Sequence, residues 1–520
     1  MDPLSILFIF SLSVLSLCLL FFSRSNQNHQ ATSVLHGLEP YPILGHLPQF
    51  LKNRHRFHDW ITGILAVTPT NSLTFRRPGT CGVITANSAV VEHILKSNFD
   101  NYPKGPRFIS ILKDFLGTGI FNADGHLWKV QRKTASYEFS TRSLRNFVVS
   151  SVQQETAGRL LPLLEKSAAS GGVIDIQDVL ERYAFDNVCM VAFNEDPACL
   201  AEGLPRDGGS NKLSPSFTNA FRDAADLSFG RFRYAITWLW KVKKLFHVGS
   251  ERRLRESIET VHDFATKIIR SRMKEREISL QPQNDDLLSR FVANEDYSEE
   301  FLRDIVISFI LAGRETTSSA LTWFFWLLSS RPGVEKKILE EIKAVRAQGQ
   351  DSGKETFEFD ELREMQYLHA AISEAMRLYP PVPMNTAECQ ADEILPDGTE
   401  IKKGWFVLYS SYAMGRMERI WGKDCHEYKP ERWLDETGAF RPESPFKFLA
   451  FHGGPRMCLG KEMAYIQMKS IVACMLERYA IEVVDKEKCP EQLLSLTLRM
   501  RGGLAVRVRN RDAATTNSLI

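Results

Sequence analysis

One long helical pattern constrains the fold of this chain more than any other feature. It begins at Ser298, a residue type that caps helices, and stops before Pro332. A helix over this stretch is roughly 32 residues and about 48 Å long. Polar side chains at 314–319 interrupt its apolar run, and such groups are costly in lipid. We therefore expect a core helix that crosses a large domain, in preference to a membrane span.

Composition fits a large globular protein and excludes several classes. The 520 residues are 44% hydrophobic, enough to bury a sizeable core. Lys plus Arg (65) and Asp plus Glu (63) nearly cancel, so charge gives no reason to expect a nucleic-acid partner. The nine cysteines form no C-x-x-C pair, which argues against a zinc site or a disulfide framework. Most of them are expected to be small buried hydrophobes.

The N-terminus carries an uncharged apolar run from Pro3 to Ser23, long enough to cross a ~30 Å hydrocarbon core. We predict a transmembrane anchor over residues 1–23. A cleaved signal peptide is the alternative, but it would need a basic start, and the only charge before the run is Asp2. Positive charge follows the run at Arg24 and Lys52, which places the rest of the chain in the cytoplasm.

The remaining chain divides into three predicted parts. Residues 24–50 are polar and then proline-rich, and we expect a stiff hinge there. Residues 51–510 form the main domain, with a surface loop at about 196–216 that is rich in Pro, Gly, Ser and Asp. Residues 511–520 are expected to be a flexible tail.

Strand patterns are few, so the predicted fold is mainly α with a small β part. Residues 394–401 predict a hairpin that turns at Asp397-Gly398. A second hairpin is predicted between Leu494–Arg499 and Leu504–Val508, joined through Gly502-Gly503.

The strongest local signal is the loop from Phe451 to Gly460, which reads Phe-His-Gly-Gly-Pro-Arg-Met-Cys-Leu-Gly. Its glycines let the backbone bend and approach a flat ligand closely. Cys458 sits just before a predicted helix over 461–476, whose positive end stabilises a thiolate.

This Phe-x-x-Gly-x-Arg-x-Cys-x-Gly pattern resembles the haem-binding signature of the cytochromes P-450. The resemblance implies the cytochrome P-450 fold and haem b, with Cys458 as the iron ligand. It places Phe451 and Gly454 beside the haem and Arg456 at a haem propionate. It also implies electrons from NADPH, delivered by NADPH–cytochrome P-450 reductase.

Ala312-Gly313-Arg314-Glu315-Thr316-Thr317, within the long helix, resembles the oxygen-activation motif of the same superfamily. Small residues at 312 and 313 would leave room above the iron, and Thr316 with Glu315 would organise proton delivery. The alternative is that Thr316 only donates a hydrogen bond to the carbonyl of Ala312, as helical Thr often does.

Two further pairs match superfamily motifs. Trp128 and Arg132 lie one helical turn apart and resemble a propionate-binding Trp-x-x-x-Arg. Glu374 and Arg377 share a helix face, and the resemblance implies a buried structural network with Arg432. One departure is Ala387, which stands where many members carry another basic residue that contacts a propionate.

Charged and aromatic surface residues suggest two contacts. Lys129, Lys133 and Lys461 would form a docking face for an acidic reductase, with a solvated charge cluster as the alternative. Aromatic and basic residues alternate between positions 229 and 244, which suits a membrane interface or a core helix with a charged face. The aromatic members are Phe229, Phe232, Tyr234, Trp238 and Trp240.

Apolar residues before, on and after the long helix are the candidate substrate pocket. They are Phe108, Ile111, Leu112, Phe115, Phe309, Ala312, Val382, Met384 and Leu496. Arg107 is a candidate for holding a carboxylate near the mouth of this pocket.

Several segments resemble the plant fatty-acid ω-hydroxylases, family ninety-four of the cytochromes P-450. They are Phe121–Gly125, Glu138–Leu144, Tyr412–Arg416 and Gly460–Ala464, within a similarity from about Leu35 to Val508. The resemblance implies hydroxylation of the terminal carbon of a fatty acid by a single-pass protein of the endoplasmic reticulum membrane. Terminal hydroxylation of a sterol side chain or of a jasmonoyl-amino-acid conjugate is the alternative. A membrane haem protein that does not oxygenate is a different class, which Glu315-Thr316 argues against.

Overall fold

The structure of the protein is a computed structural model that describes residues 38, 40–139, 147, 151–201, 214–234, 238–278, 286–348 and 354–511. The predicted anchor, most of the hinge and the tail beyond Arg511 lie outside the described residues, as does much of the predicted loop at 196–216. Within the described ranges, no helix combines the length and apolar character that a bilayer crossing requires. The long helix at 299–328 is among those that fall short.

The described end of the hinge is partly helical. Helix α2 spans Leu47–Lys52 and carries Pro48 in its first turn, where the missing N–H costs nothing. Helix α3 (Phe57–Val67) follows and packs beside a sheet.

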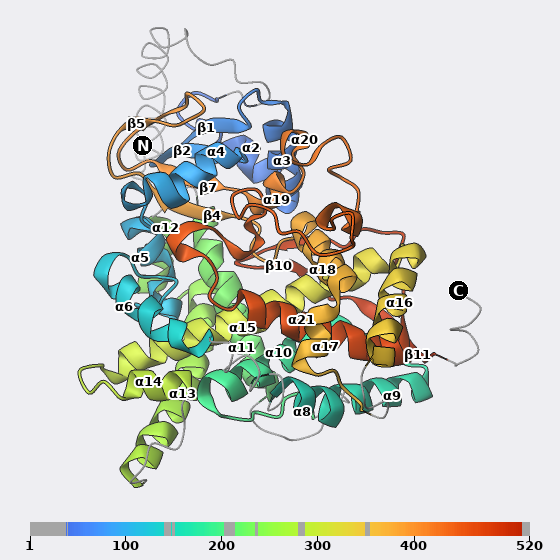
Figure 1. Ribbon diagram of the computed structural model, residues 1–520. Coiled ribbons are helices and arrows are strands. Elements are labelled where there is room, and N and C mark those ends of the chain that lie inside the picture. Colours follow the sequence, from blue (N-terminus) through green and yellow to red (C-terminus); the bar gives the residue numbers. More distant parts are fainter. Residues whose placement is uncertain are drawn as a thin grey trace, which may run out of the picture.

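A four-stranded sheet lies at the top of Figure 1, in the order β1-β2-β7-β4. Strands β1 (Ser72–Arg77) and β2 (Thr80–Thr85) form an antiparallel hairpin. Strand β7 (Phe406–Tyr409) runs parallel to β2 and antiparallel to β4 (Asn385–Glu388). The sheet therefore joins the start of the chain to segments more than 300 residues later.

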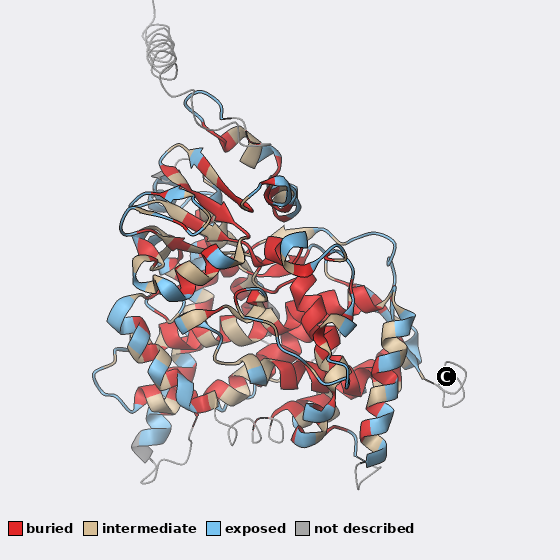
Figure 2. Cartoon of the chain, turned by 45° about the horizontal axis from the view of Figure 1, so that its top comes forward, coloured by how far each residue is buried: buried red, intermediate tan, exposed pale blue. Residues whose placement is uncertain are grey.

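The helical body below the sheet is built around α15, Glu299–Leu328, which confirms the predicted long helix. The Ser298 side chain accepts a hydrogen bond from the Phe301 N–H at 3.2 Å, so it caps the helix as expected. Most buried residues gather in this body (Figure 2).

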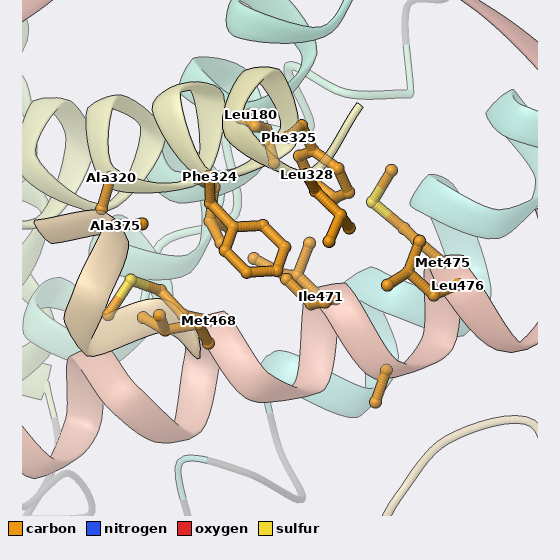
Figure 3. Close-up of a cluster of buried hydrophobic side chains, with 14 of the residues drawn as sticks. Leu180, Ala320, Phe324, Phe325, Leu328, Ala375, Met468, Ile471, Met475 and Leu476 are labelled. Atoms are coloured by element: carbon orange, nitrogen blue, oxygen red, sulfur yellow. The ribbon is translucent and has the colours of Figure 1, made fainter. Parts of the chain in front are cut away.

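Helix α15 packs against α10 (Ile176–Phe193), α18 (Gln366–Leu378) and α21 (Lys461–Arg478). Figure 3 shows side chains of α15 and α21 meeting between the two helices. The labelled members of this cluster are Leu180, Ala320, Phe324, Phe325, Leu328, Ala375, Met468, Ile471, Met475 and Leu476.

Shorter helices complete the fold, and α4, α19 and α20 lie beside the four-stranded sheet (Figure 1). The α-helices are α4 (Ser88–Glu92), α5 (Gly105–Leu116), α6 (Gly125–Ser136), α8 (Gln153–Glu155), α9 (Leu161–Ser170), α11 (Ser214–Gly230), α12 (Trp238–Leu245), α13 (Ser250–Ile278), α14 (Leu287–Val292), α16 (Pro332–Gln348), α17 (Phe359–Glu364), α19 (Ser411–Met414) and α20 (Glu418–Trp421). Short 3-10 helices include Leu449–Phe451 and Gly454–Arg456.

One predicted hairpin is confirmed and the other is wrong. Strands β5 (Glu393–Ile394) and β6 (Glu400–Ile401) pair antiparallel, and Gly398 takes a positive φ at the turn between them. The segments 494–499 and 504–508, by contrast, do not pair with each other.

The C-terminal strands belong to two sheets. Strand β9 (Gln492–Leu494) pairs with β10 (Leu498–Met500). Strand β11 (Ala505–Asn510) lies between β3 (Val173–Asp175) and β8 (Tyr479–Val483). Close packing at Gly503 explains why these segments separate. A Cβ at this position would lie 2.0 Å from the Asp175 carboxylate. That carboxylate accepts from Leu504 N–H, which holds the chain beside β3 and away from β10.

Candidate haem site

The loop before α21 folds tightly around Cys458. The Cys458 N–H donates to the carbonyl of Phe451 at 2.8 Å, which closes the loop. Gly454 has φ +62°, and a Cβ there would lie 1.9 Å from the carbonyl oxygen of Leu95. Only glycine satisfies both the backbone conformation and the space at this position.

Cys458 offers a free, solvent-accessible sulfur. Desolvation by the surrounding loop raises the pKa of the thiol, while the Gly460 N–H and the charges of Arg132 and Lys461 lower it. Among the described cysteines only Cys458 and Cys489 are exposed. Coordination to a metal ion ionises such a thiol outright, because the ion's charge dominates the local field.

The Phe451 ring lies 5.1 Å from that of Tyr465 in α21. The next residue, His452, was not predicted as a site residue. It takes φ +62°, and its Nε2 lies 2.8 Å from the hydroxyl of Tyr409 in β7. Burial lowers the pKa of His452 to about 3, so the imidazole is neutral and ties the loop to the sheet. No sequence signal marks this pair, which spans 43 residues.

Trp128, Arg132 and Arg456 come together as the motifs predicted. The Arg456 guanidinium stacks 4.4 Å from the ring of buried Trp128, and the Arg132 guanidinium lies 5.9 Å from the same ring. Arg132 also donates to the carbonyl of Met457, next to the cysteine. Arg456 pairs with Asp124 at 2.6 Å.

Lys104 is a third cation in this group, and no motif predicted it. Its backbone N–H and that of Gly105 donate to the two carboxylate oxygens of Asp124. Burial and the nearby charge of Arg456 lower the pKa of Lys104 to about 7. Ala387 of β4, which stands where many cytochromes P-450 carry a basic residue, is buried and adds no charge.

The long helix carries Thr316 with its hydroxyl bonded to its own helix. Thr316 Oγ1 donates to the carbonyl of Ala312 at 2.6 Å, and the side chain is half-buried. This is the helix-internal hydrogen bond that the sequence analysis gave as the alternative to a role in proton delivery. It also fixes the direction of the hydroxyl. Gly313 serves helix packing, because a Cβ there would lie 2.5 Å from Cγ2 of Val188 in α10.

Glu315 is fully buried beside Thr316 in the chain. Its Oε2 accepts from Thr497 at 3.0 Å, and its Oε1 lies 3.6 Å from Arg314 Nη1. Burial raises the pKa of Glu315, although the charge of Arg314 acts to lower it. Arg314 pairs in turn with Glu181 of α10 at 2.9 Å. The acid therefore belongs to a buried ion network that sequence reasoning missed.

Comparison with known proteins agrees with this geometry. A family model described as cytochrome P450 matches residues 35–504. The chain belongs to the cytochrome P450 family. Cytochrome P450 CYP94D108 of Paris polyphylla is 51% identical over 470 residues, 90% of this chain and 92% of the relative. Cytochrome P450 94A1 of Vicia sativa is 44% identical over 482 residues (91% and 90%), and cytochrome P450 94B1 of Arabidopsis thaliana 45% over 480 (91% and 91%).

Family membership makes the protein a haem-thiolate monooxygenase, which excludes the haem protein that does not oxygenate. The residues in the structure fit the haem. Lys104, Arg132 and Arg456 are three cations, and Asp124 is the only described acid in an ion pair with any of them. Two propionates would balance the two remaining positive charges, and Cys458 supplies the one thiol in the loop.

The Glu374–Arg377 network is confirmed as a buried P450 scaffold. Arg377 donates to Glu374 at 2.7 and 2.8 Å, and Arg432 donates to the same carboxylate at 3.0 Å. Trp433 Nε1 adds a further bond at 2.9 Å. Neither Glu374 nor Arg377 is exposed, so the role is structural as expected.

The predicted substrate residues fall into two groups. Ile111, Leu112 and Phe115 are 3% exposed or less and pack in a core cluster of α5, α11, α13 and α15. The other candidates are only half-buried, namely Phe108, Phe309, Ala312, Val382, Met384 and Leu496. Phe108, Phe309 and Leu496 border that cluster together with Leu459, the residue after Cys458.

Arg107 lies in the first turn of α5 and lines a cavity of about 420 Å³ at the edge of the four-stranded sheet. Its guanidinium donates to Thr80 Oγ1 in β2.

The two predicted surface features are visible on the outside of the P450 domain. Lys129 and Lys133 are exposed on one face of α6, whereas Lys461 is half-buried.

Helix α12 exposes Leu239, Val242 and Leu245, with lysines between them. Trp240 is instead buried, 4.4 Å from the Arg231 guanidinium. The side chain of Trp238 lies outside the described residues.

Proposed function

We propose that this P450 hydroxylates the terminal (ω) carbon of an aliphatic chain, with a fatty acid as substrate. It binds haem b and takes electrons from NADPH through NADPH–cytochrome P450 reductase. We place it at the endoplasmic reticulum membrane, held by the single N-terminal anchor with the catalytic domain in the cytoplasm.

The observation that carries the proposal is the set of half-buried apolar side chains that border the same core cluster as Leu459 of the cysteine loop. Phe108, Phe309 and Leu496 come from three separate elements and border one cluster with Leu459. Apolar walls of this kind bind hydrocarbon without orienting a polar scaffold. The similarity to P450s numbered in family 94 supports an aliphatic substrate in particular.

Different residues of the chain have different roles around the haem. The haem, held by Cys458, supplies activation of dioxygen. Arg132 and Arg456 would hold the propionates, and Phe451 would shield the sulfur. Thr316 holds a hydroxyl in a fixed direction through its bond to Ala312, from which it could pass a proton. The apolar side chains exclude water and leave only the end of a narrow chain within reach.

Two surfaces support the partner and the location. Lys129 and Lys133 present positive charge without a described acidic partner, which suits docking of an acidic reductase. The exposed apolar residues of α12, with lysines between them, suit contact with a lipid surface.

Substrate choice is tested by turnover of microsomes that contain the protein and its reductase. The panel holds fatty acids, sterols and jasmonoyl-amino-acid conjugates, and mass spectrometry locates the oxidised carbon. Formation of ω-hydroxy fatty acids is expected. Turnover restricted to a sterol or to a jasmonoyl conjugate would replace the proposal with one of those alternatives.

Cys458→Ala tests the haem ligand directly. We expect loss of the reduced carbon monoxide band that defines the family, because no other described cysteine lies in the loop. Cys489→Ala, which removes the other exposed cysteine, is the matched control and should leave the band unchanged. An intact band in Cys458→Ala would contradict the assignment.

A further inference from the structure

The turn between β9 and β10 consists of residues 495–497, because Leu494 and Leu498 are the last paired residues of the two strands. Ser495 and Thr497 are 2% and 3% exposed, whereas Leu496 between them is half-buried. Buried polar side chains are normally hydrogen-bonded, so the bonds of Ser495 and Thr497 show what holds this turn in place.

The two polar side chains of the turn bond to acids on two different helices. Ser495 Oγ donates to Asp226 in α11, and Thr497 Oγ1 donates to Oε2 of Glu315 in α15 at 3.0 Å. Leu496 instead packs against the core cluster that the proposed substrate residues border. One short turn therefore contacts both the acid of the long helix and the apolar side chains proposed to hold the substrate.

The start of β10 is fixed to the same long helix. The carbonyl of Leu498 accepts hydrogen bonds from Ser319 Oγ at 2.6 Å and from Trp323 Nε1 at 2.8 Å, and both donors belong to α15. These bonds hold the strand that follows Thr497 against the helix that carries Glu315. The Thr497 hydroxyl therefore has a defined place beside the carboxyl group.

The two oxygens of Glu315 have different surroundings. Oε2 accepts the bond from Thr497, whereas Oε1 is buried without a hydrogen-bond partner in the described part of the chain and lies 3.6 Å from Arg314 Nη1. Burial raises the pKa of Glu315, so the carboxyl keeps a proton to higher pH than an exposed glutamate does. Because Oε2 already accepts a hydrogen bond, Oε1 is the better place for that proton.

We propose that Thr497 is a positioning residue for Glu315, and that substrate contact with Leu496 is transmitted to this acid through the turn. The inference rests on the proposed roles of Glu315 and of the apolar pocket. Thr497 fixes the carboxyl through Oε2 and leaves Oε1 as the oxygen that gives up the proton. An aliphatic chain seated against Leu496 displaces the turn and changes the Thr497 bond, so proton delivery depends on an occupied pocket.

Charged groups from four elements also face Glu315. Burial is the largest influence on its pKa and raises it. The charges of Arg314 in α15 and Arg499 in β10 lower the pKa, and those of Asp226 in α11 and Glu181 in α10 raise it. Thr497 carries no charge, so Thr497→Val leaves these charges in place and tests the hydrogen bond by itself.

Infrared difference spectroscopy of the haem-loaded protein tests the positioning role. The carboxyl band of Glu315 is the band that Glu315→Gln removes. Thr497→Val should shift this band, because the carboxyl loses its donor, and Thr497→Ser should restore the wild-type position. Thr322→Val is the matched control, since Thr322 is a buried threonine of α15 whose hydroxyl donates to the carbonyl of Ser318 in its own helix. It should leave the band unchanged.

The ratio of product formed to NADPH consumed separates positioning from a structural role. Thr497→Val should lower this ratio about fivefold, the usual effect of losing one hydrogen bond, and should move its pH profile. Thr497→Ser and Thr322→Val should keep the wild-type ratio and profile. A Thr497→Val protein with reduced haem content but an unchanged ratio and pH profile per haem would overturn the positioning role.

Dodecanoic acid tests the link between the pocket and Glu315. Saturating ligand should shift the Glu315 carboxyl band in the wild type, and Leu496→Ala should lose this shift while its ligand-free band stays in place. An unchanged wild-type band, measured while the Soret band shows that the acid has bound, would overturn the link.

Failure of the inference and failure of the proposed function give different results. If dodecanoic acid neither binds nor reacts, the proposed substrate is wrong, and the ligand-free bands of the Thr497 variants still decide the positioning role. An unchanged ligand-free band in Thr497→Val would overturn that role while leaving ω-hydroxylation in place. The carbon monoxide band checks that each variant is intact. If Thr497→Val fails this check, the response of the wild-type band to dodecanoic acid decides the inference.

Discussion

Two buried ion networks support this P450, and they differ in how completely their bonds are made. The Glu374 network joins Glu374 to Arg377, Arg432 and Trp433. The Glu181 network joins Glu181 to three arginines of α11, α15 and β10. Both carboxylates are almost completely buried.

The Glu374 network is closed. Both oxygens of Glu374 accept several hydrogen bonds, and Arg377 also donates to the carbonyls of Gly415, Cys425 and Glu427. Such a network holds the segment before the haem loop in one geometry, because every donor has its acceptor.

The Glu181 network leaves atoms unpaired. Arg314 Nη1 and Glu315 Oε1 are buried without a hydrogen bond, and burial raises the pKa of Asp226 at its edge. Arg222 remains 28% exposed. The Glu374 network therefore gives rigidity to the segment before the Cys458 loop, whereas the Glu181 network leaves a donor and an acceptor unpaired beside Thr316.

Glu374→Gln has the largest expected effect. It leaves buried Arg377 without a counter-charge and removes one of the two carboxylates that pair with Arg432, which should lower the free energy of unfolding by about 3–5 kcal/mol and reduce haem incorporation. Urea unfolding and the carbon monoxide band measure both effects. Glu259→Gln, in the exposed pair with Arg255, is the control and should cost less than about 0.5 kcal/mol. Equal effects in the two variants would remove the distinction.

Glu181→Gln should cost less, about 1.5–3 kcal/mol, because Arg222 can turn to solvent and Arg499 keeps Asp226 at 3.5 Å. Urea unfolding beside Glu374→Gln provides the ranking. A larger loss of unfolding free energy in Glu181→Gln than in Glu374→Gln would show that the Glu181 network contributes more to the stability of the fold.

Glu181 and Glu315 should contribute to stability with opposite dependence on pH. Burial alone would raise the pKa of Glu181, but the three guanidiniums around it lower it to about 2. Its stabilisation is therefore present above its ordinary value of 4.5 and is lost as pH falls toward 2. The raised pKa of Glu315 makes its contribution fall as pH rises above 4.5.

Unfolding free energies of the two glutamine variants, measured across the pH range, test this. Glu181→Gln should flatten the acid limb of the profile, and Glu315→Gln should reduce the decline on the alkaline side of 4.5. Parallel profiles for both variants and the wild type would contradict the assignment of opposite shifts.

Thr316→Ala has the smallest expected effect on stability, within about 0.5 kcal/mol, because it removes only a bond to its own helix. Its effect should appear in coupling, as a lower ratio of product formed to NADPH consumed. Thr316→Ser keeps the hydroxyl and should restore the ratio. Unchanged coupling in the alanine variant would leave Thr316 with the helix bond alone.

Local patterns predicted much of the fold and the haem side of the site. The cap at Ser298 and the break at Pro332 predicted the long helix, and the motif around Cys458 predicted a tight loop with an exposed cysteine, because both depend on residues close in sequence. The second hairpin was predicted wrongly for the opposite reason. Asp175 holds Leu504 from a position 329 residues away, and no local pattern contains that bond.

The sequence by itself determined the family, the cysteine proposed to bind the haem, the Trp128–Arg132 pair and the Glu374–Arg377 pair. Each of these is a short motif whose spacing puts two side chains on one face of a helix or in one tight loop. Only the tertiary structure brought Lys104 to Asp124, His452 to Tyr409, and Arg107 to Thr80. Those contacts join strands and helices far apart in the chain, so their energies depend on burial and on charges that spacing does not encode.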